Sequence, residues 1–298
     1  MKIELLPALI LSLLIEGVKA DEICKLEVKV SKGQPKEFKC NIHGIFYPIE
    51  CKLPEFSDDL KNGVIVNGDS IDFKEGFVMD RVFQIPAHST YTVMEKTANA
   101  KVNTVTGTKN VLAIWVKATN AKPTLPIEGQ TNSLADDVFG IYGDPYNPRS
   151  QYKACSNNKL DMAPANLVTS TGVEITNGVY ALEVGSPIMS IGKGFETIVQ
   201  EAATKVLGDL PSQFDHVMFC MPKGVKEGGV QSFAYAYLNS YLSVYGDKEC
   251  HYETGAIHEF GHNFGLDHSN EGPETKPNSE YEDYSGQVRN PSPILQAE

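Results

Sequence analysis

The stretch HEFGHNFGLDH, from His258 to His268, places three histidines in one short segment. His258 and His262 are four residues apart, so on a helix they lie one turn apart on the same face. Gly265 permits a backbone conformation that is costly for residues with a Cβ, so the chain can leave the helix sharply and bring His268 back. We therefore predict a helix that ends near Gly265 and three imidazoles that face one point.

Three neutral histidine nitrogens bind zinc and leave its fourth tetrahedral position open, whereas structural zinc sites are normally closed by four protein ligands. Zinc lowers the pKa of a bound water from about 15.7 to roughly 7 and polarises a carbonyl group. Glu259 is next to a ligand, where it can take the proton of the water and pass it to the leaving amine. The sequence thus predicts His258, His262 and His268 as zinc ligands and Glu259 as the catalytic residue.

The main alternative to a zinc site is a chance match, because HExxH alone is a short motif. Gly265 and His268 fix two further positions, which makes a chance match rare. The remaining histidines show no such spacing, and we expect them to be ordinary surface or hydrogen-bonded residues: His43, His88, His216 and His251.

The composition is that of a globular protein. Of the 298 residues, 41% are hydrophobic and 21% are charged, and we find neither an internal repeat nor a low-complexity tract. The formal net charge of −12 argues against nucleic acid or an anionic membrane as a partner.

The N-terminus has the pattern of a secretory signal peptide. Lys2 precedes an apolar run over residues 5–15, and the small residue Ala20 follows. A membrane anchor or a buried strand is the alternative, but the run is shorter than the roughly 20 residues that span a membrane. We predict a signal peptide over residues 1–20, secretion to the extracellular space, and no membrane association after its removal.

Secretion makes the cysteines candidates for disulfides, because exported thiols meet an oxidising environment. The sequence contains six of them: Cys24, Cys40, Cys51, Cys155, Cys220 and Cys250. Their spacing alone does not determine which of them pair.

Residues 21–106 have the pattern of a β-rich region. Asn67 and Gly68 lie between alternating apolar residues in VIVNGDSIDF, which predicts a two-residue hairpin turn. Strand-like runs continue through GFVMDRVFQI and STYTVMEK. The polar stretch AKVNTVTGTKN lacks clear periodicity and indicates a boundary near residue 107.

From residue 107 onwards, strand and helix patterns alternate. Continuous apolar runs predict strands over 110–118 and 216–221. Between them, GFETIVQEAATKVLGDL has the helical period, with Gly208 as a natural C-cap. The tyrosine-rich segment 233–245 has the composition of a strand. This alternation predicts an α/β or α+β layer structure.

HEFGHNFGLDH matches the pattern HExxHxxGxxH, so the chain resembles the metzincin zinc metalloendopeptidases. More narrowly, it looks like the gametolysin-type (M11) peptidases of algae and other protists. The narrower likeness covers about residues 107–286 and is weaker for 21–106. It rests on SQYKACSNNKL, DHVMFCMP, AYAYLNSYLSVYGDKEC, HSNEG and YEDYSG.

The resemblance implies an α+β fold in which a small β-rich domain precedes a metzincin-like catalytic domain with a twisted mixed sheet and an active-site helix. Residues 1–20 would be the signal peptide, 21–106 a β-rich N-terminal domain or pro-domain, and 107–298 the catalytic domain. The implied cofactor is Zn²⁺ on the three motif histidines, at the bottom of a cleft, with Glu259 as the base. The implied substrates are extracellular matrix or cell-wall proteins. In the catalytic domain we expect a disulfide between Cys220 and Cys250.

The C-terminal stretch departs from the family pattern. Metzincins carry a methionine in a turn beneath the metal, and Gln287 and Val288 stand where it is expected. The last methionine is Met221, and the likeness ends after Gly286, so we expect the methionine turn and a C-terminal subdomain to be missing. A thioether supports the imidazoles without binding the metal, so its loss should degrade the geometry rather than abolish zinc binding.

Two features admit two interpretations each. An edge strand within 233–245 would bind an extended peptide by strand addition, whereas an interior strand would simply pack its tyrosines. If residues 21–106 are a pro-domain, Cys24, Cys40 or Cys51 would hold the fourth zinc position as a thiolate, whereas export favours disulfides.

We predict a secreted zinc-dependent endopeptidase that hydrolyses peptide bonds of matrix or cell-wall proteins through a zinc-activated water. The alternative is a catalytically impaired, zinc-binding secreted protein that binds matrix or cell-wall partners. Glu259 favours the enzyme, because a binding module has no need of a carboxylate beside a zinc ligand, whereas the abrupt terminus favours the alternative. The lack of a G-x-S-x-G motif argues against a serine hydrolase.

Overall fold

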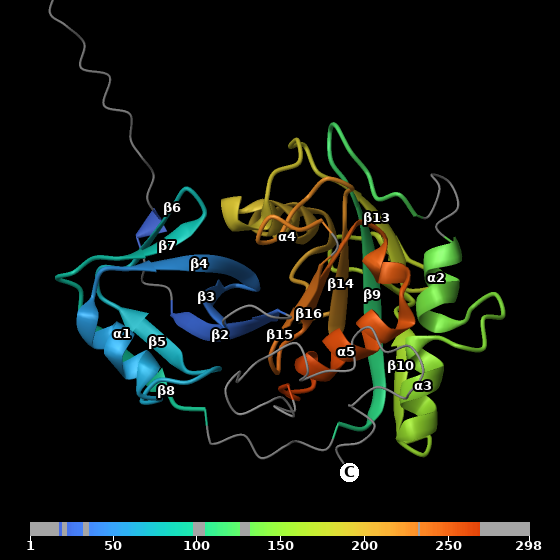
Figure 1. Cartoon of the computed structure of the whole chain (residues 1–298), viewed down its shortest axis with the longest axis horizontal. Coiled ribbons are helices and arrows are strands. Elements are labelled where there is room, and N and C mark those ends of the chain that lie inside the picture. Colours follow the sequence, from blue (N-terminus) through green and yellow to red (C-terminus); the bar gives the residue numbers. More distant parts are fainter. Residues whose placement is uncertain are drawn as a thin grey trace, which may run out of the picture.

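The computed structural model describes residues 18–19, 23–31, 36–97, 105–125, 132–231 and 233–268 (Figure 1). Within them, the strands form one large mixed sheet and one two-stranded sheet, with few helices, which agrees with the α+β prediction. The predicted signal peptide lies outside the described residues except for the short strand β1 (Val18–Lys19) beside β6. No helix in the described ranges has the length and apolar character that crossing a membrane requires.

The N-terminal region, residues 23–97, is rich in strands, as expected. Its core contains Leu26, Phe56, Phe73 and Phe83, all buried, and the disulfide Cys24–Cys40 joins two adjacent strands within it. The elements are β2 (Cys24–Ser31), β3 (Glu37–Ile42), β4 (Ile45–Cys51), α1 (Pro54–Lys61), β5 (Ser70–Phe73), β6 (Phe77–Met79), β7 (Val82–Ile85) and β8 (Tyr91–Glu95).

The hairpin predicted at Asn67 and Gly68 is wrong, although a turn does form there, with Gly68 at φ +88°. The residues before the turn do not form a strand. The side chain of Asn67 instead accepts the Val28 N–H at 2.8 Å and donates to the Leu238 carbonyl at 2.9 Å. These long-range bonds hold the turn against β2 and against Leu238, in place of a pairing within a local hairpin.

The C-terminal region, residues 105–268, is built on a buried central strand, β9 (Gly107–Lys117), as the apolar run predicts. Five strands lie parallel to one another, and β15 alone of the six main strands runs antiparallel, next to β16. The other strands are β10 (Leu160–Pro164), β13 (Val179–Glu183), β14 (His216–Met221), β15 (Ala234–Tyr237) and β16 (Leu242–Gly246), with a small pair formed by β11 (Leu167–Val168) and β12 (Glu174–Ile175).

Helices cover both faces of this sheet (Figure 1). On one face, α4 (Phe195–Leu207) packs against alternate strand residues such as Ile114 and Phe219; it ends at the predicted C-cap Gly208. On the other face, the residues in between, such as Trp115 and Met218, pack against the remaining helices. These are α2 (Asn132–Phe139), α3 (Pro148–Cys155) and α5 (Glu253–Asn263), with short 3₁₀ turns η1 (Ile191–Lys193) and η2 (Asp247–His251) elsewhere.

The segment 233–245 forms two strands, because a turn after Tyr237 reverses the chain between β15 and β16. On its other side β15 pairs antiparallel with β2, so that Tyr235 faces Ser31 and Tyr237 faces Lys29. The interpretation of 233–245 as a sheet edge is therefore wrong for this chain, because β2 joins the two regions into one sheet. The expected disulfide between Cys220 and Cys250 is present.

Candidate metal centre

Helix α5 carries the first two motif histidines and ends at the predicted glycine. Gly265 adopts φ +90°, in the left-handed region where a Cβ is costly. Its N–H donates to the His262 carbonyl at 2.9 Å, and the Leu266 N–H donates to the Gly261 carbonyl at 3.0 Å. These two bonds close the last turn of the helix and send the chain back towards His268.

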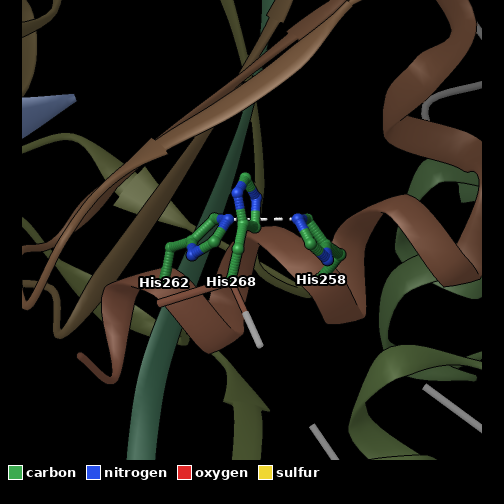
Figure 2. A group of neighbouring side chains, drawn as sticks. All are labelled: His258, His262 and His268. Atoms are coloured by element: carbon green, nitrogen blue, oxygen red, sulfur yellow. Dashed lines mark hydrogen bonds between the residues drawn. The ribbon is translucent and has the colours of Figure 1, made fainter. Parts of the chain in front are cut away.

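The three histidines converge on one point, although they come from two segments (Figure 2). One ring nitrogen from each of His258, His262 and His268 lies within 4.8 Å of those of the other two. The Nε2 atoms of His258 and His262 are 3.0 Å apart. The structure thus brings all three sequence-predicted ligands together.

This arrangement fits a tetrahedral metal ion. Two nitrogens that bind zinc at 2.0–2.1 Å with tetrahedral angles are about 3.4 Å apart, close to the separation of the two Nε2 atoms. The Nδ1–H of His262 donates to the Leu266 carbonyl at 2.7 Å, which leaves the Nε2 lone pair for a metal. Burial, together with nearby His258, lowers the pKa of His262 to about 3, so this imidazole is neutral at physiological pH. Neutral imidazoles are common zinc ligands.

Glu259 follows the first histidine on α5, and only 5% of its surface is exposed. Two buried phenols lie within range of its charge: burial raises the pKa of Tyr152 and Tyr245 well above 10, and Glu259 contributes to both shifts. The Tyr152 hydroxyl donates to the Ile257 carbonyl at 2.7 Å and thereby ties α3 to α5. The carboxyl group is therefore held in largely dehydrated surroundings.

Two asparagines that the motif analysis did not single out fix α5 against the sheet. The Asn263 amide donates to the Tyr237 carbonyl at 3.1 Å and to the Leu242 carbonyl at 3.0 Å, at the two ends of the β15–β16 turn. The Asn239 N–H, in that turn, donates to the His262 carbonyl at 2.8 Å. The sequence did offer a signal for Asn263: it is a polar residue that stands directly between the second motif histidine and Phe264.

The other histidines lie outside the cluster. His88 is exposed and pairs with Glu75, and His251 pairs with Asp137. The expectation is wrong for His216, which is 6% exposed and packs edge-on against Phe260 and Phe264; its Nδ1 has no hydrogen-bond partner in the described ranges. Burial lowers its pKa to about 4, because the charged form would lose its hydration.

The cysteines of the N-terminal region bear on the thiolate hypothesis. Cys24 and Cys40 form a disulfide, so neither offers a thiolate to a metal. Cys51 lies in β4, where its thiol donates to the Leu53 carbonyl at 3.3 Å. For Cys24 and Cys40, the structure therefore agrees with a disulfide and not with a thiolate on the metal. The positions expected for the methionine turn, 287 and 288, lie outside the described residues.

Comparison with known families connects this geometry to a class of enzyme. The gametolysin peptidase M11 family matches residues 131–289, more than half of the chain, and the match contains all three histidines and Glu259. The chain belongs to the gametolysin peptidase family. No significant match was found to a curated protein or to a solved structure. Membership of the gametolysin family implies a metallopeptidase that acts on protein substrates.

Proposed function

We propose that this member of the gametolysin family is a secreted, zinc-dependent endopeptidase with His258, His262 and His268 as metal ligands. The observation that carries the proposal is the convergence of three histidine nitrogens within 4.8 Å of one another. Glu259 is buried next to the first of them on the same helix. Together these groups form a three-nitrogen site with an adjacent carboxylate, which suits a hydrolytic metal site rather than a structural one.

Zinc bound there would lower the pKa of a water molecule to roughly 7 and polarise the carbonyl group of the peptide bond. Glu259 would accept the proton of the attacking water and donate it to the leaving amine nitrogen. The Leu266 carbonyl holds the His262 ring in the tautomer that presents Nε2. Asn263 keeps α5 in register with the β15–β16 turn, so the histidines and the carboxylate keep their spacing.

The proposed division is a signal peptide over residues 1–20, a β-rich N-terminal domain or pro-domain over 21–106, and a catalytic domain over 107–298. Support for a metzincin-like catalytic domain comes from its mixed sheet, in which β15 alone is antiparallel, and from the helix that follows β16 with the histidines. Separate cores support the division: one lies within the N-terminal region, and two flank the sheet of the C-terminal region.

The proposed substrates are extracellular matrix or cell-wall proteins. This follows from the family likeness, and secretion agrees with the disulfides Cys24–Cys40 and Cys220–Cys250. The buried carboxylate of Glu259 supports an active hydrolase over a zinc-binding adhesion protein, because burying a carboxylate is costly and a binding protein gains nothing from it.

Cleavage of an unstructured, fluorescently labelled protein by the purified full chain tests the proposal. We expect cleavage that a chelator stops, that zinc restores and that Glu259→Ala abolishes. Glu253→Ala, on the first turn of the same helix, is the matched control and should retain activity. Cleavage that persists in the Glu259 variant, or no cleavage from a folded, zinc-loaded chain with the N-terminal region released, would refute the proposal.

A further inference from the structure

A cavity of about 600 Å³ lies where the N-terminal and C-terminal regions meet. Its walls come from strand β2, from the beginning of β14, from the turn between β15 and β16, and from the end of α5. The described residues that line it do not include the three motif histidines. Pockets of this size hold small organic ligands, whereas a single water molecule needs only about 30 Å³. The cavity therefore has room for a ligand of its own.

Two buried polar side chains form the floor of this cavity: Asn263, which is 4% exposed, and His216, which is 6% exposed. The Asn263 amide nitrogen donates to two backbone carbonyls, so its Oδ1 can only accept a hydrogen bond. Within the described ranges, neither this Oδ1 nor the Nδ1 of His216 has a hydrogen-bond partner. Buried polar atoms without a partner are rare and costly, so two of them in one cavity point to a ligand that pairs with both.

The charged groups of the cavity are already paired with one another. The buried carboxylate of Glu27 lies 3.0 Å from Lys25 Nζ, and the hydroxyl of Ser240 also donates to it. At the rim, Lys109 Nζ lies 3.6 Å from the carboxylate of Asp215. An ionic ligand would have to separate such a pair or be held next to a like charge, and both are costly away from water. The lining therefore favours a neutral ligand.

Hydroxyl groups suit both atoms on the floor. A hydroxyl donates to Asn263 Oδ1, which a carboxylate or a phosphate dianion cannot do. Burial lowers the pKa of His216 to about 4, so its ring is neutral and Nδ1 carries either a proton or a lone pair. A hydroxyl both donates and accepts, so it matches either form of Nδ1. Val105 and Phe264 add apolar wall for C–H groups. A sugar ring supplies hydroxyl and C–H groups together.

We propose that this cavity binds a neutral saccharide, which forms hydrogen bonds with Asn263 Oδ1 and His216 Nδ1. The site adjoins the metal centre: Asn263 directly follows the ligand His262, and Asn239 at the rim donates its N–H to the His262 carbonyl at 2.8 Å. The saccharide is either free or attached to a protein. In the attached form it would hold a glycosylated protein beside the zinc site, and this use rests on the proposed peptidase function. Binding of the saccharide does not.

Saturation-transfer NMR on the full chain tests the site directly. The probes are glucose, galactose and mannose, each with its amino and uronic-acid counterpart, at about pH 6, where the amino sugars are cationic and the uronic acids anionic. At least one neutral sugar should bind, and its two charged counterparts should bind at least about tenfold more weakly. Tighter binding of a charged counterpart would overturn the inference. No binding of any of these sugars would mean that the cavity holds water only, and would overturn it as well.

Two variants assign the binding to this cavity. Thr106→Trp places a large side chain at the exposed rim and should abolish binding of the sugar, whereas Thr108→Trp, also exposed but outside the lining, is the matched control and should bind it normally. His216→Phe keeps an aromatic ring against Phe260 and Phe264 but removes Nδ1. Binding should weaken about tenfold in this variant, with no fall in the unfolding temperature. Unchanged binding in both cavity variants would overturn the inference.

Cleavage rates distinguish a free saccharide from an attached one. The substrates are a glycoprotein that carries the sugar found to bind and the same protein after enzymatic removal of its glycans. If the site holds an attached glycan, the ratio of the two rates should favour the glycoprotein about tenfold more in the wild type than in Thr106→Trp. Equal ratios, together with binding in the NMR experiment, would assign the site to a free saccharide. Binding of the sugar without any cleavage would overturn the peptidase function and support the saccharide site.

Discussion

Helices α4 and α5 cover opposite faces of one sheet, and both bury polar side chains, but the two sets of polar groups have different partners. On α4, Thr197 and Gln200 bond to the backbone of Phe46, and Glu196 accepts the hydroxyls of two tyrosines of β15. On α5, buried polar groups gather around the histidines, and the Asn263 amide bonds to the backbone of β15 and β16.

Burial of polar groups alone therefore does not identify an active site. The polar groups of α4 meet hydroxyl and backbone partners and so stabilise the contact between two regions. Those of α5 present nitrogen atoms to one another, an arrangement that is unfavourable without a proton or a metal ion between them. Three ring nitrogens that point to one position, rather than burial, identify the candidate site.

The largest expected effect is on the α5 face. Glu259→Gln keeps the shape of the side chain but removes the proton acceptor, so the cleavage rate should fall about 10²–10⁴-fold. The zinc content should stay the same, because the three ligands are intact. Rates are compared at equal zinc loading, with Glu253→Gln as the control. A Glu259→Gln chain that cleaves at the wild-type rate would show that Glu259 is not the proton acceptor.

The next effect is on the α4 face. Phe46→Ala empties a buried position that stacks on Tyr237, so the free energy of unfolding should fall by about 3–5 kcal/mol. Denaturant unfolding measures this, and Tyr146→Ala, at a site that is 70% exposed, should have little effect. If the two sides of the sheet serve the separate purposes described, the zinc affinity of Phe46→Ala should match that of the wild type. A weaker zinc site would link the two faces.

A smaller effect is expected at the C-terminal end of α5. Gly265→Ala has open space for a Cβ, with its nearest neighbour 3.7 Å away at Asn239, but φ +90° strains any residue other than glycine. The cost should be about 1–2 kcal/mol, which lowers zinc affinity roughly tenfold if the strain shifts His268. Gly255→Ala, in the first turn of the same helix, should instead stabilise the protein by up to roughly 0.5–1 kcal/mol. Equal zinc affinity in both variants would contradict the role of the turn.

The smallest effect is expected at an ion pair that belongs neither to the polar groups of α4 nor to those of α5. Arg149 on α3 donates to Asp161 of β10 at 2.6 and 3.1 Å, and this pair lowers the pKa of Asp161 below its ordinary 3.8. Its stabilisation is therefore present above pH 3.8 and is lost as the pH falls through the lowered pKa. Asp161→Asn should reduce the free energy of unfolding by about 1 kcal/mol or less at neutral pH, with no difference in strong acid. A constant difference across pH would show that another contact is responsible.

The sequence predicted the convergence of the three histidines better than it predicted the contacts between the two regions. The helix around His258, the turn at Gly265 and the return of His268 follow from local spacing, and the structure has all three. Likewise, the apolar runs predicted β9 and β14, and helical periodicity predicted α4. These features depend on neighbours along the chain.

The pairing of β2 with β15 was not predictable in the same way, because about 200 residues separate Lys29 from Tyr237 and many registers satisfy the same alternation. The turn at Asn67 was misread for a related reason, since its amide bonds to Val28 and Leu238 rather than within a hairpin. His216 has no local signal for burial, which comes from Phe260 and Phe264 on a distant helix.

X-ray absorption of the zinc-loaded full chain tests whether the three histidines hold the catalytic metal. We expect one zinc ion per chain, with nitrogen and oxygen neighbours at about 2.0–2.1 Å and no sulfur. Zinc should be lost in His262→Ala and retained in His88→Ala. A sulfur neighbour at about 2.3 Å, or full zinc content in the His262 variant, would show that the three histidines are not the zinc ligands.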